Sequence, residues 1–109
     1  MINYIILQLP MSNPSKFMNL NWVEKRFGVP NKEDYVQVYA GEEIDYQDTE
    51  TILNAIWDKL NINHPADYHA HSLSVSDVVG LNVDNRYWEW YYVDSIGFKR
   101  IWEEQDERI

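Results

Sequence analysis

A single amphipathic segment, residues 48–61, places the strongest constraint on how this chain can fold. Its apolar side chains recur every three or four positions, as along one side of a helix, and they are Ile52, Leu53, Ile56, Trp57 and Leu60. Asp48 or Thr49 is placed to cap the first turn, and Lys59 suits the last. Such a stripe must be covered, and in a chain of 109 residues a sheet face is the expected cover.

Five short segments have the residue pattern of strands, and the sheet is expected to come from them. They are residues 4–9, 35–40, 78–83, 87–94 and 98–102. The helix at residues 48–61 is expected to pack on a face containing Val36, Val38, Val78 and Val93. A second helix is expected over residues 13–27 with Asn13 as its cap, unless residues 19–21 break it into two pieces.

Together these elements predict an α+β domain with a small, mainly antiparallel sheet and two helices packed on one face. Residues 1–109 are expected to form one domain, with an acidic C-terminal tail from about residue 103. The absence of cysteine excludes disulfides and thiolate sites, and no run of about 18 apolar residues could cross a bilayer. Residues 1–4 lack the basic start of a signal peptide, so we expect a cytoplasmic protein, and no cofactor is expected.

The charge is strongly acidic and unevenly distributed. Eighteen acidic residues oppose nine basic ones, which leaves a net charge of −9. Between Lys32 and Lys59 there is no base, and the acids there are Glu33, Asp34, Glu42, Glu43, Asp45, Asp48, Glu50 and Asp58. Direct binding of nucleic acid needs a basic face, so this balance disfavours it and favours a partner protein with a basic surface. A solvated face that keeps the protein soluble is the alternative.

The partner contacts are expected from the middle of this acidic stretch and from an aromatic strand. The acidic candidates are Glu42, Glu43, Asp45, Asp48 and Glu50. In residues 87–92 alternate side chains face opposite ways, so one set is core and the other is free for an interface. Trp88 and Trp90 are the candidates from this strand.

A regular block of three serines and an aspartate, Ser72, Ser74, Ser76 and Asp77, precedes an apolar run. With His69 and His71 it contains every residue type of a hydrolytic triad. A triad, however, needs side chains that converge from separate elements, and the Gly-x-Ser-x-Gly turn of a common hydrolase class is missing. We therefore predict no catalytic residue here, and a structural role in which serine and aspartate side chains bond backbone groups of a turn.

A metal site in the same segment is also weighed. On extended backbone the rings of His69 and His71 would lie on one face, with His64 and Asp67 close in sequence. The spacing matches no strong ligand motif, so no metal ligand is predicted.

The order of several blocks along the chain resembles a known family. The blocks are residues 17–22, 35–39, 61–65, 72–79 and 92–98, and the specific ones are the serine-aspartate block and Tyr-Val-Asp-Ser-x-Gly-Phe, which contains Asp94 and Gly97. The chain is similar, from about Phe17 to Ile101, to the YodL-like domain, which many large polyvalent proteins of Gram-positive conjugative elements and phages carry. The family usually has Gly or Arg and then a basic or polar residue before the serines, where this chain has Ala70 and His71.

The resemblance implies a biological setting and no catalytic residues. Such elements encode many small proteins that blunt host defence, and family members look like modulators of host proteins. We therefore expect an inhibitor that acts by binding, most sharply an anti-CRISPR or anti-restriction protein that occupies a nucleic-acid site on a Cas effector or restriction complex. A small nuclease or hydrolase using residues 64–77, or a regulator of a host cytoskeletal protein, are the alternatives.

Overall fold

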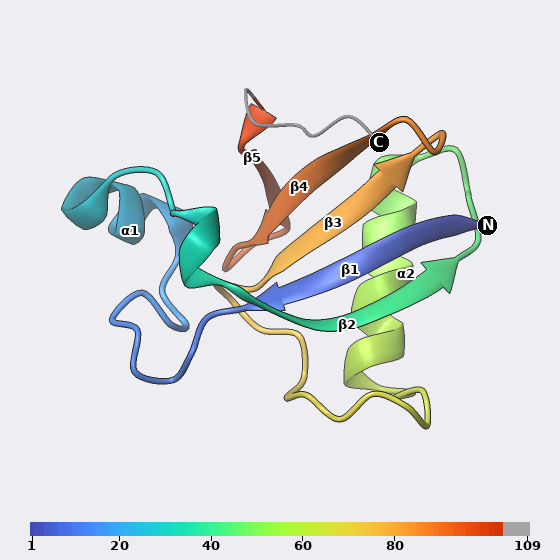
Figure 1. Ribbon diagram of the computed structural model, residues 1–109, viewed down its shortest axis with the longest axis horizontal. Helices are drawn as coiled ribbons and strands as arrows, with labels where there is room; N and C mark the ends of the chain where they lie inside the picture. Colours follow the sequence, from blue (N-terminus) through green and yellow to red (C-terminus); the bar gives the residue numbers. More distant parts are fainter. Residues whose placement is uncertain (104–109) are drawn as a thin grey trace.

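The structure, a computed structural model, describes residues 1–103, and it is an antiparallel sheet with two helices (Figure 1). The order of elements is β1 (Ile2–Gln8), α1 (Leu20–Phe27), the short 3-10 helix η1 (Lys32–Asp34), β2 (Val36–Glu43), α2 (Thr49–Asn61), β3 (Val78–Val83), β4 (Tyr87–Val93) and β5 (Phe98–Ile101). The strands lie in the order β2-β1-β3-β4-β5, and each neighbouring pair is antiparallel. The α+β class predicted above is therefore confirmed. Most of the predicted acidic tail falls outside the described residues.

The helix predicted from residues 48–61 is present as α2 and covers one face of the sheet. Four of its five stripe residues are buried, while Trp57 is partly exposed. They pack on side chains of β1, β3 and β4, namely Ile2, Tyr4, Ile6, Val79, Leu81 and Val93. Of the four valines expected under this helix, Val38 and Val93 belong to this cluster, but Val36 is 54% exposed and Val78 faces the opposite side.

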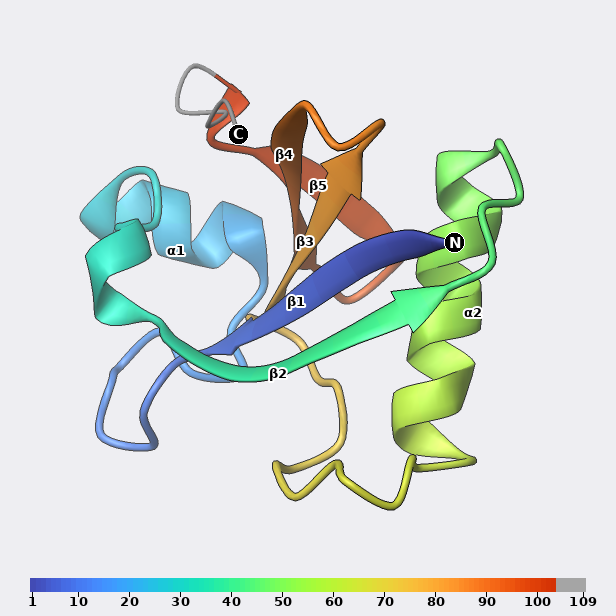
Figure 2. The ribbon, with the colours of Figure 1, turned by 45° about the vertical axis from the view of Figure 1, so that its right-hand side comes forward.

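The opposite face carries a second, aromatic core to which α1 contributes. It contains Leu7, Leu20, Val78, Trp90, Tyr92, Ile101 and Trp102. The indole of Trp90 lies directly over Gly80, where an added Cβ would stand 2.5 Å from the ring, so this crossing requires glycine. The twisted sheet thus stands between the helices (Figure 2), and of the two only α2 packs on the face where both were expected.

The first helix is shorter than the range expected from the sequence. It begins at Leu20, because Asn19 and not Asn13 is its cap, with the Asn19 side chain accepting a hydrogen bond from the backbone N–H of Trp22. Phe17 has φ 68°, a left-handed conformation in which a right-handed helix cannot continue. Residues 9–19 therefore form a loop that leads from β1 to α1.

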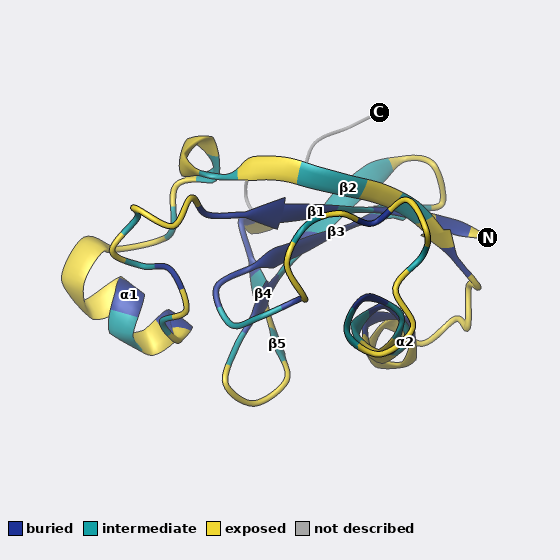
Figure 3. Cartoon of the chain, turned by 90° about the horizontal axis from the view of Figure 1, so that it is seen from below, coloured by how far each residue is buried: buried dark blue, intermediate teal, exposed yellow. Residues whose placement is uncertain are grey.

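Exposure follows the layers of the fold. In the view of Figure 3, buried backbone lies in the centre of the sheet and on the side of α2 that faces it, while most of α1 and much of β2 are exposed. Within the described range no helix is long and apolar enough to cross a membrane.

Candidate functional site

The serine-aspartate block forms a tight turn that ends where β3 begins, and Asp77 is its buried centre. The Asp77 side chain is inaccessible to solvent. Its Oδ2 accepts hydrogen bonds from the backbone N–H of Ser74 at 2.8 Å and from Nε2 of Gln8 at 3.1 Å. The Asp77 N–H in turn donates to the carbonyl of Ser74 at 3.0 Å. The turn is thus held by side-chain to backbone bonds, as aspartate commonly holds turns.

A buried lysine completes this cluster. Lys16 Nζ lies 3.7 Å from Asp77 Oδ1 and 2.6 Å from His71 Nε2. An ammonium group can only donate, so His71 Nε2 accepts this bond, and its Nδ1 donates to the carbonyl of Ser72 at 2.7 Å.

Burial dominates the electrostatics of the pair. It raises the pKa of Asp77 to about 6, although the Ser74 N–H, the charge of Lys16 and the Gln8 amide favour the ionised carboxylate. Burial also lowers the pKa of Lys16, against the attraction of Asp77. Asp77 Oδ1 accepts no hydrogen bond from the described residues, so Lys16 at 3.7 Å is the group that compensates its charge. The cluster is therefore costly to disturb, because each charge would otherwise be buried alone.

The two blocks that carry the family resemblance converge on one segment, the end of the loop before α1. Ser76 Oγ accepts a hydrogen bond from the Phe17 N–H at 2.9 Å. Asp94 Oδ1 accepts one from the N–H of Leu20, the first residue of α1, at 3.2 Å. Tyr92 donates its hydroxyl to the carbonyl of Met18 at 2.6 Å. Residues distant in sequence thus fasten the start of α1 to the sheet.

Backbone geometry supports the same arrangement. Ser76 has φ 84°, and its N–H donates to the carbonyl of Val93 at 2.9 Å. Its own carbonyl accepts a bond from the Tyr35 hydroxyl at 2.7 Å. Gly97 has φ 68° in the β4–β5 turn, where its carbonyl accepts from the Asp94 N–H, and glycine adopts that conformation without a steric penalty.

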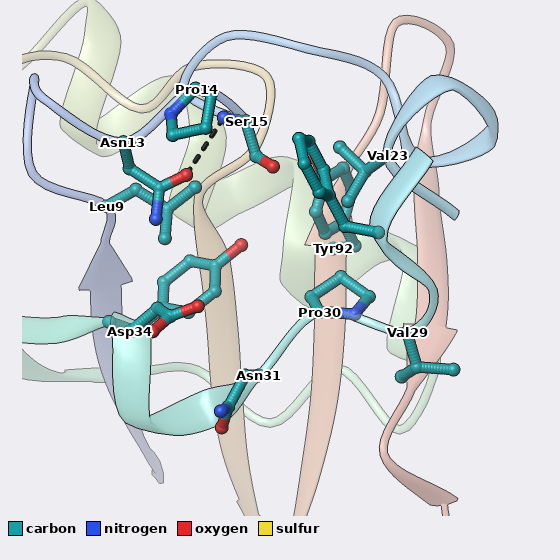
Figure 4. Close-up of a pocket in the computed structure, with 12 residues that line it drawn as sticks. Leu9, Asn13, Pro14, Ser15, Val23, Val29, Pro30, Asn31, Asp34 and Tyr92 are labelled. Atoms are coloured by element: carbon teal, nitrogen blue, oxygen red, sulfur yellow. Dashed lines mark hydrogen bonds between the residues drawn. The ribbon is translucent and has the colours of Figure 1, made fainter. Parts of the chain in front are cut away.

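Next to this cluster a pocket of about 280 Å³ opens between the loop after β1, α1 and the segment that leads into β2 (Figure 4). Asn13, Pro14 and Ser15 form one side, and Pro30, Asn31 and Asp34 lie across the opening. The remaining lining residues, mostly apolar, are Leu9, Val23, Phe27, Val29, Tyr35 and Tyr92. Burial raises the pKa of both tyrosines well above the usual range, so their hydroxyls stay protonated and serve as donors.

The hydroxyl and imidazole groups of the serine block do not form a catalytic triad. Ser74 Oγ donates to the Ser72 carbonyl, and Ser76 Oγ accepts from the backbone. Ser72 Oγ lies 3.4 Å from His64 Nε2 at the surface, while Asp77 is buried against Lys16. What the block visibly does is to order a turn and anchor a loop.

No metal-binding geometry is formed by residues 1–103, because no three histidine, aspartate or glutamate side chains there come together. His71 uses its two ring nitrogens for Lys16 and the Ser72 carbonyl. Asp67 instead accepts a hydrogen bond from the Tyr39 hydroxyl at 3.0 Å.

The acidic candidates lie at the far end of the molecule from α1, where β2 leads into α2 (Figure 1). Glu42, Asp45, Asp48 and Glu50 are exposed. Glu43 was expected to contact a partner, but it is only 6% exposed, and its Oε1 forms a 2.8 Å ion pair with Lys59 Nζ. Its side chain lies inward because strand residues alternate, and Lys59 compensates its charge.

In the aromatic strand β4, only one of the two tryptophans expected to contact a partner is accessible at the surface. Trp90 is 2% exposed and forms part of the second core, so it is unavailable as a surface contact. Lys32 Nζ lies 3.8 Å from the centre of the Trp90 ring. Trp88 stacks on the same ring, with the two ring centres 5.8 Å apart. Trp88 is half-buried and remains the candidate from this strand.

Sequence reasoning missed three members of the cluster: Gln8, Lys16 and Tyr35. Gln8 contacts Asp77 across 69 positions of the chain, Lys16 contacts His71 across 55, and Tyr35 contacts Ser76 across 41. A lysine or glutamine that ends inside a protein carries no local pattern, because its partner is supplied by tertiary packing. Tyr35 alternated correctly with its neighbours, but alternation does not identify a hydrogen-bond partner.

Comparison with known proteins identifies the family to which this chain belongs. The model of the YodL-like domain matches residues 3–104, nearly the whole chain. No curated protein and no solved structure matches this chain. The chain, with its turn centred on Asp77 and its anchor at Asp94, belongs to the YodL-like domain family.

Proposed function

We propose that the protein acts by binding, as an inhibitor or modulator of a host protein, and that the segment between β2 and α2 docks on a basic surface. One observation carries this proposal. Glu42, Asp45, Asp48 and Glu50 are all exposed on one continuous segment, in a stretch of sequence that contains no base. Four exposed carboxylates attract a positive surface over a distance set by the screening length, about 8 Å at physiological ionic strength.

The most specific form of the proposal is an anti-CRISPR or anti-restriction protein of a mobile element. Surfaces that normally hold DNA or RNA are basic, and a carboxylate-rich segment can occupy them in place of phosphates. The net charge of −9 supports this form, because it disfavours direct contact with the nucleic acid itself. The role of Asp77 is then internal: it anchors the fold and does not touch the partner.

A small nuclease or hydrolase is the alternative, and the exposed contact between Ser72 Oγ and His64 Nε2 at 3.4 Å is the one feature that favours it. A nucleophile and base need a shorter hydrogen bond and a third group that orients the base. Ser72→Ala tests this alternative, because it would abolish a hydrolytic activity and leave inhibition by binding unchanged.

The partner is to be sought by affinity capture from host lysate with mass spectrometry, repeated after nuclease treatment. A defence effector captured in both conditions supports direct protein binding. Capture that disappears after nuclease treatment would mean that nucleic acid bridges the two proteins and would contradict the proposal. A captured cytoskeletal protein would replace the defence target by a cytoskeletal one.

The docking surface is then tested with the triple variant Glu42→Lys, Asp45→Lys and Glu50→Lys. Glu43 is left unchanged because it is buried in the ion pair with Lys59. The matched control is Glu24→Lys, Glu33→Lys and Asp58→Lys, which changes the net charge equally at exposed sites outside the segment. We expect the first variant to lower the association rate by about tenfold or more and the control to change it little.

The dependence of the association rate on salt concentration gives a second measurement. Association of the wild type should slow as ionic strength rises, because the attraction between exposed charges is screened. Binding that is independent of salt and equal in the two triple variants would contradict the proposed docking surface. The acidic segment would then serve only to keep the protein soluble.

A further inference from the structure

The pocket beside α1 has a mainly apolar wall, and some of its apolar side chains are exposed to solvent. Phe27 and Val29 both line it and are 58% and 63% exposed. Leu9 from the loop after β1, Val23 from α1 and Tyr92 from β4 line its inner part. Exposed apolar groups around a concave site are a common mark of binding sites.

The polar groups of this pocket are largely committed to the protein itself. The Tyr35 hydroxyl donates to the Ser76 carbonyl, and the Tyr92 hydroxyl donates to the Met18 carbonyl. Pro14 and Pro30 contribute no N–H. The tyrosine rings therefore act as walls, and a ligand is held chiefly by apolar contact.

Asp34 is the one charged residue in the lining of this pocket. Two cations of the surrounding segment are engaged elsewhere: the Arg26 guanidinium lies 4.2 Å from the centre of the Trp22 ring, and Lys32 Nζ lies 3.8 Å from that of Trp90. The electrostatic complement of this opening is consequently a cation.

The walls are also held in place before any ligand arrives. Ser76 accepts a hydrogen bond from the hydroxyl of the lining residue Tyr35, and a second from the N–H of Phe17, two positions after the lining residue Ser15. Lys16, which directly follows the lining residue Ser15, is buried against Asp77 and His71. A pocket whose walls are tied to the sheet loses little entropy when it is filled.

We propose that this pocket receives one apolar side chain, aromatic or of leucine size, from a partner polypeptide in which lysine or arginine is the next residue and pairs with Asp34. The volume of about 280 Å³ is at the small end for ligand sites, which fits a single side chain. The apolar wall selects that side chain, and the Asp34 carboxylate selects the cation beside it. This site lies at the opposite end of the molecule from the acidic segment and is independent of it.

Three short probes test the two requirements separately: acetyl-Phe-Arg-amide, acetyl-Phe-Glu-amide and acetyl-Gly-Arg-amide. Each is titrated into the isotopically labelled full-length chain, and the backbone amide shifts are followed by NMR. We expect saturable shifts around Val23, Val29 and Asp34 with the first probe. Its dissociation constant should be about threefold to fivefold lower than that of acetyl-Phe-Glu-amide, the range of an exposed ion pair. The glycine probe should give no saturable shift at these residues.

Matched variants locate the contacts. Asp34→Lys should reverse the preference between the arginine and glutamate probes, while Glu33→Lys, one position away and outside the pocket lining, should preserve it. Val29→Asn should weaken acetyl-Phe-Arg-amide severalfold, while Val36→Asn, at a valine that is also exposed but does not line the pocket, should not. All four substitutions are at exposed positions, so an unchanged melting temperature verifies that the fold is intact.

The result that would overturn the proposal is equally concrete. Shifts that do not saturate, that spread over another surface, or that ignore both Asp34→Lys and Val29→Asn would exclude this pocket as the site. The triple variant Glu42→Lys, Asp45→Lys and Glu50→Lys should bind acetyl-Phe-Arg-amide as the wild type does. Failure of the acidic docking surface and failure of this pocket are therefore separate outcomes.

Discussion

Asp77 and the acidic segment between β2 and α2 present the same chemical group in opposite surroundings. Asp77 is inaccessible to solvent, bonded to Gln8 and Ser74 and balanced by Lys16. Glu42 and its exposed neighbours Asp45, Asp48 and Glu50 stand in water. A buried carboxylate acts on the free energy of folding, because removing its partners leaves a charge in a medium that solvates it poorly. An exposed one acts on what approaches from outside.

Residue type alone therefore does not separate buried from exposed positions in this chain. Adjacent positions make the point, since Glu43 is buried in an ion pair with Lys59 and Glu42 is exposed. The same holds for Trp90 and Trp88, of which only the former is fully buried.

The largest effect is expected from placing a carboxylate where none exists. Ile56→Asp puts a charge at a fully buried position of α2, which should destabilise the protein by about 4 kcal/mol or more. The control is Ile62→Asp just beyond the same helix, where the isoleucine is exposed and the change should cost little. Thermal and urea unfolding measure both. Equal melting temperatures would contradict the packing assigned to α2.

Removing the native buried carboxylate is expected to rank second. Asp77→Ala frees Ser74 and Gln8 and leaves Lys16 with an uncompensated charge, so we expect a loss of about 3 kcal/mol. Asp58→Ala, at an exposed aspartate of α2, is the control. Binding activity should fall only as far as the folded fraction does. Lost activity at unchanged stability would instead make Asp77 a contact or catalytic residue.

The third expected effect is on the pH dependence of stability. Burial raises the folded-state pKa of Asp77 from 3.8 to about 6, so the folded chain holds this proton more tightly than the unfolded one. The resulting stabilisation is complete below pH 3.8 and is lost as pH rises through about 6. Relative to Asp77→Asn, wild-type unfolding free energy should fall by roughly 3 kcal/mol over this interval.

Urea unfolding of both proteins from pH 4 to pH 7 measures this difference, and the other carboxylates cancel because both proteins carry them. A difference that stays flat over the interval, or that rises with pH, would contradict a raised pKa at Asp77.

The smallest effect separates the two neighbouring glutamates. Glu43→Gln weakens a 2.8 Å ion pair in which Lys59 is partly in solvent, so it should cost only about 1 kcal/mol. Glu42→Gln should leave stability nearly unchanged, since Glu42 is exposed. Binding to the captured partner should show the reverse order, with Glu42→Gln the weaker binder. Equal effects of the two on both stability and binding would remove the contrast.

Local pattern was sufficient for much of the fold. The stripe from Ile52 to Leu60 identified α2 because apolar periodicity in a helix is a property of neighbouring residues. Short apolar or aromatic runs likewise placed the strands to within a few residues, and in β2 the pattern was alternation. It could not tell which set of β4 side chains, Trp88 and Trp90 or Tyr91 and Val93, would face which layer, because alternation has no absolute direction.

Local sequence predicted only part of the candidate site. The turn-forming role expected of Ser76 and Asp77 follows from short polar side chains that bond nearby backbone, as Asp77 does with Ser74. The start of α1 was placed wrongly because the left-handed backbone of Phe17 accompanies its bond to Ser76, 59 positions away. No window of sequence around Phe17 contains that partner.

Patterns among near neighbours were enough to predict α2, the strands and the turn before β3, composition showed the acidic balance, and the order of sequence blocks indicated the family. Tertiary structure alone decided that Lys16 and Gln8 meet Asp77, that Glu43 lies inward and Glu42 outward, and that a pocket opens beside α1. The physical reason is that burial belongs to the assembled chain: the same carboxylate costs or contributes free energy according to which distant segments exclude water from it.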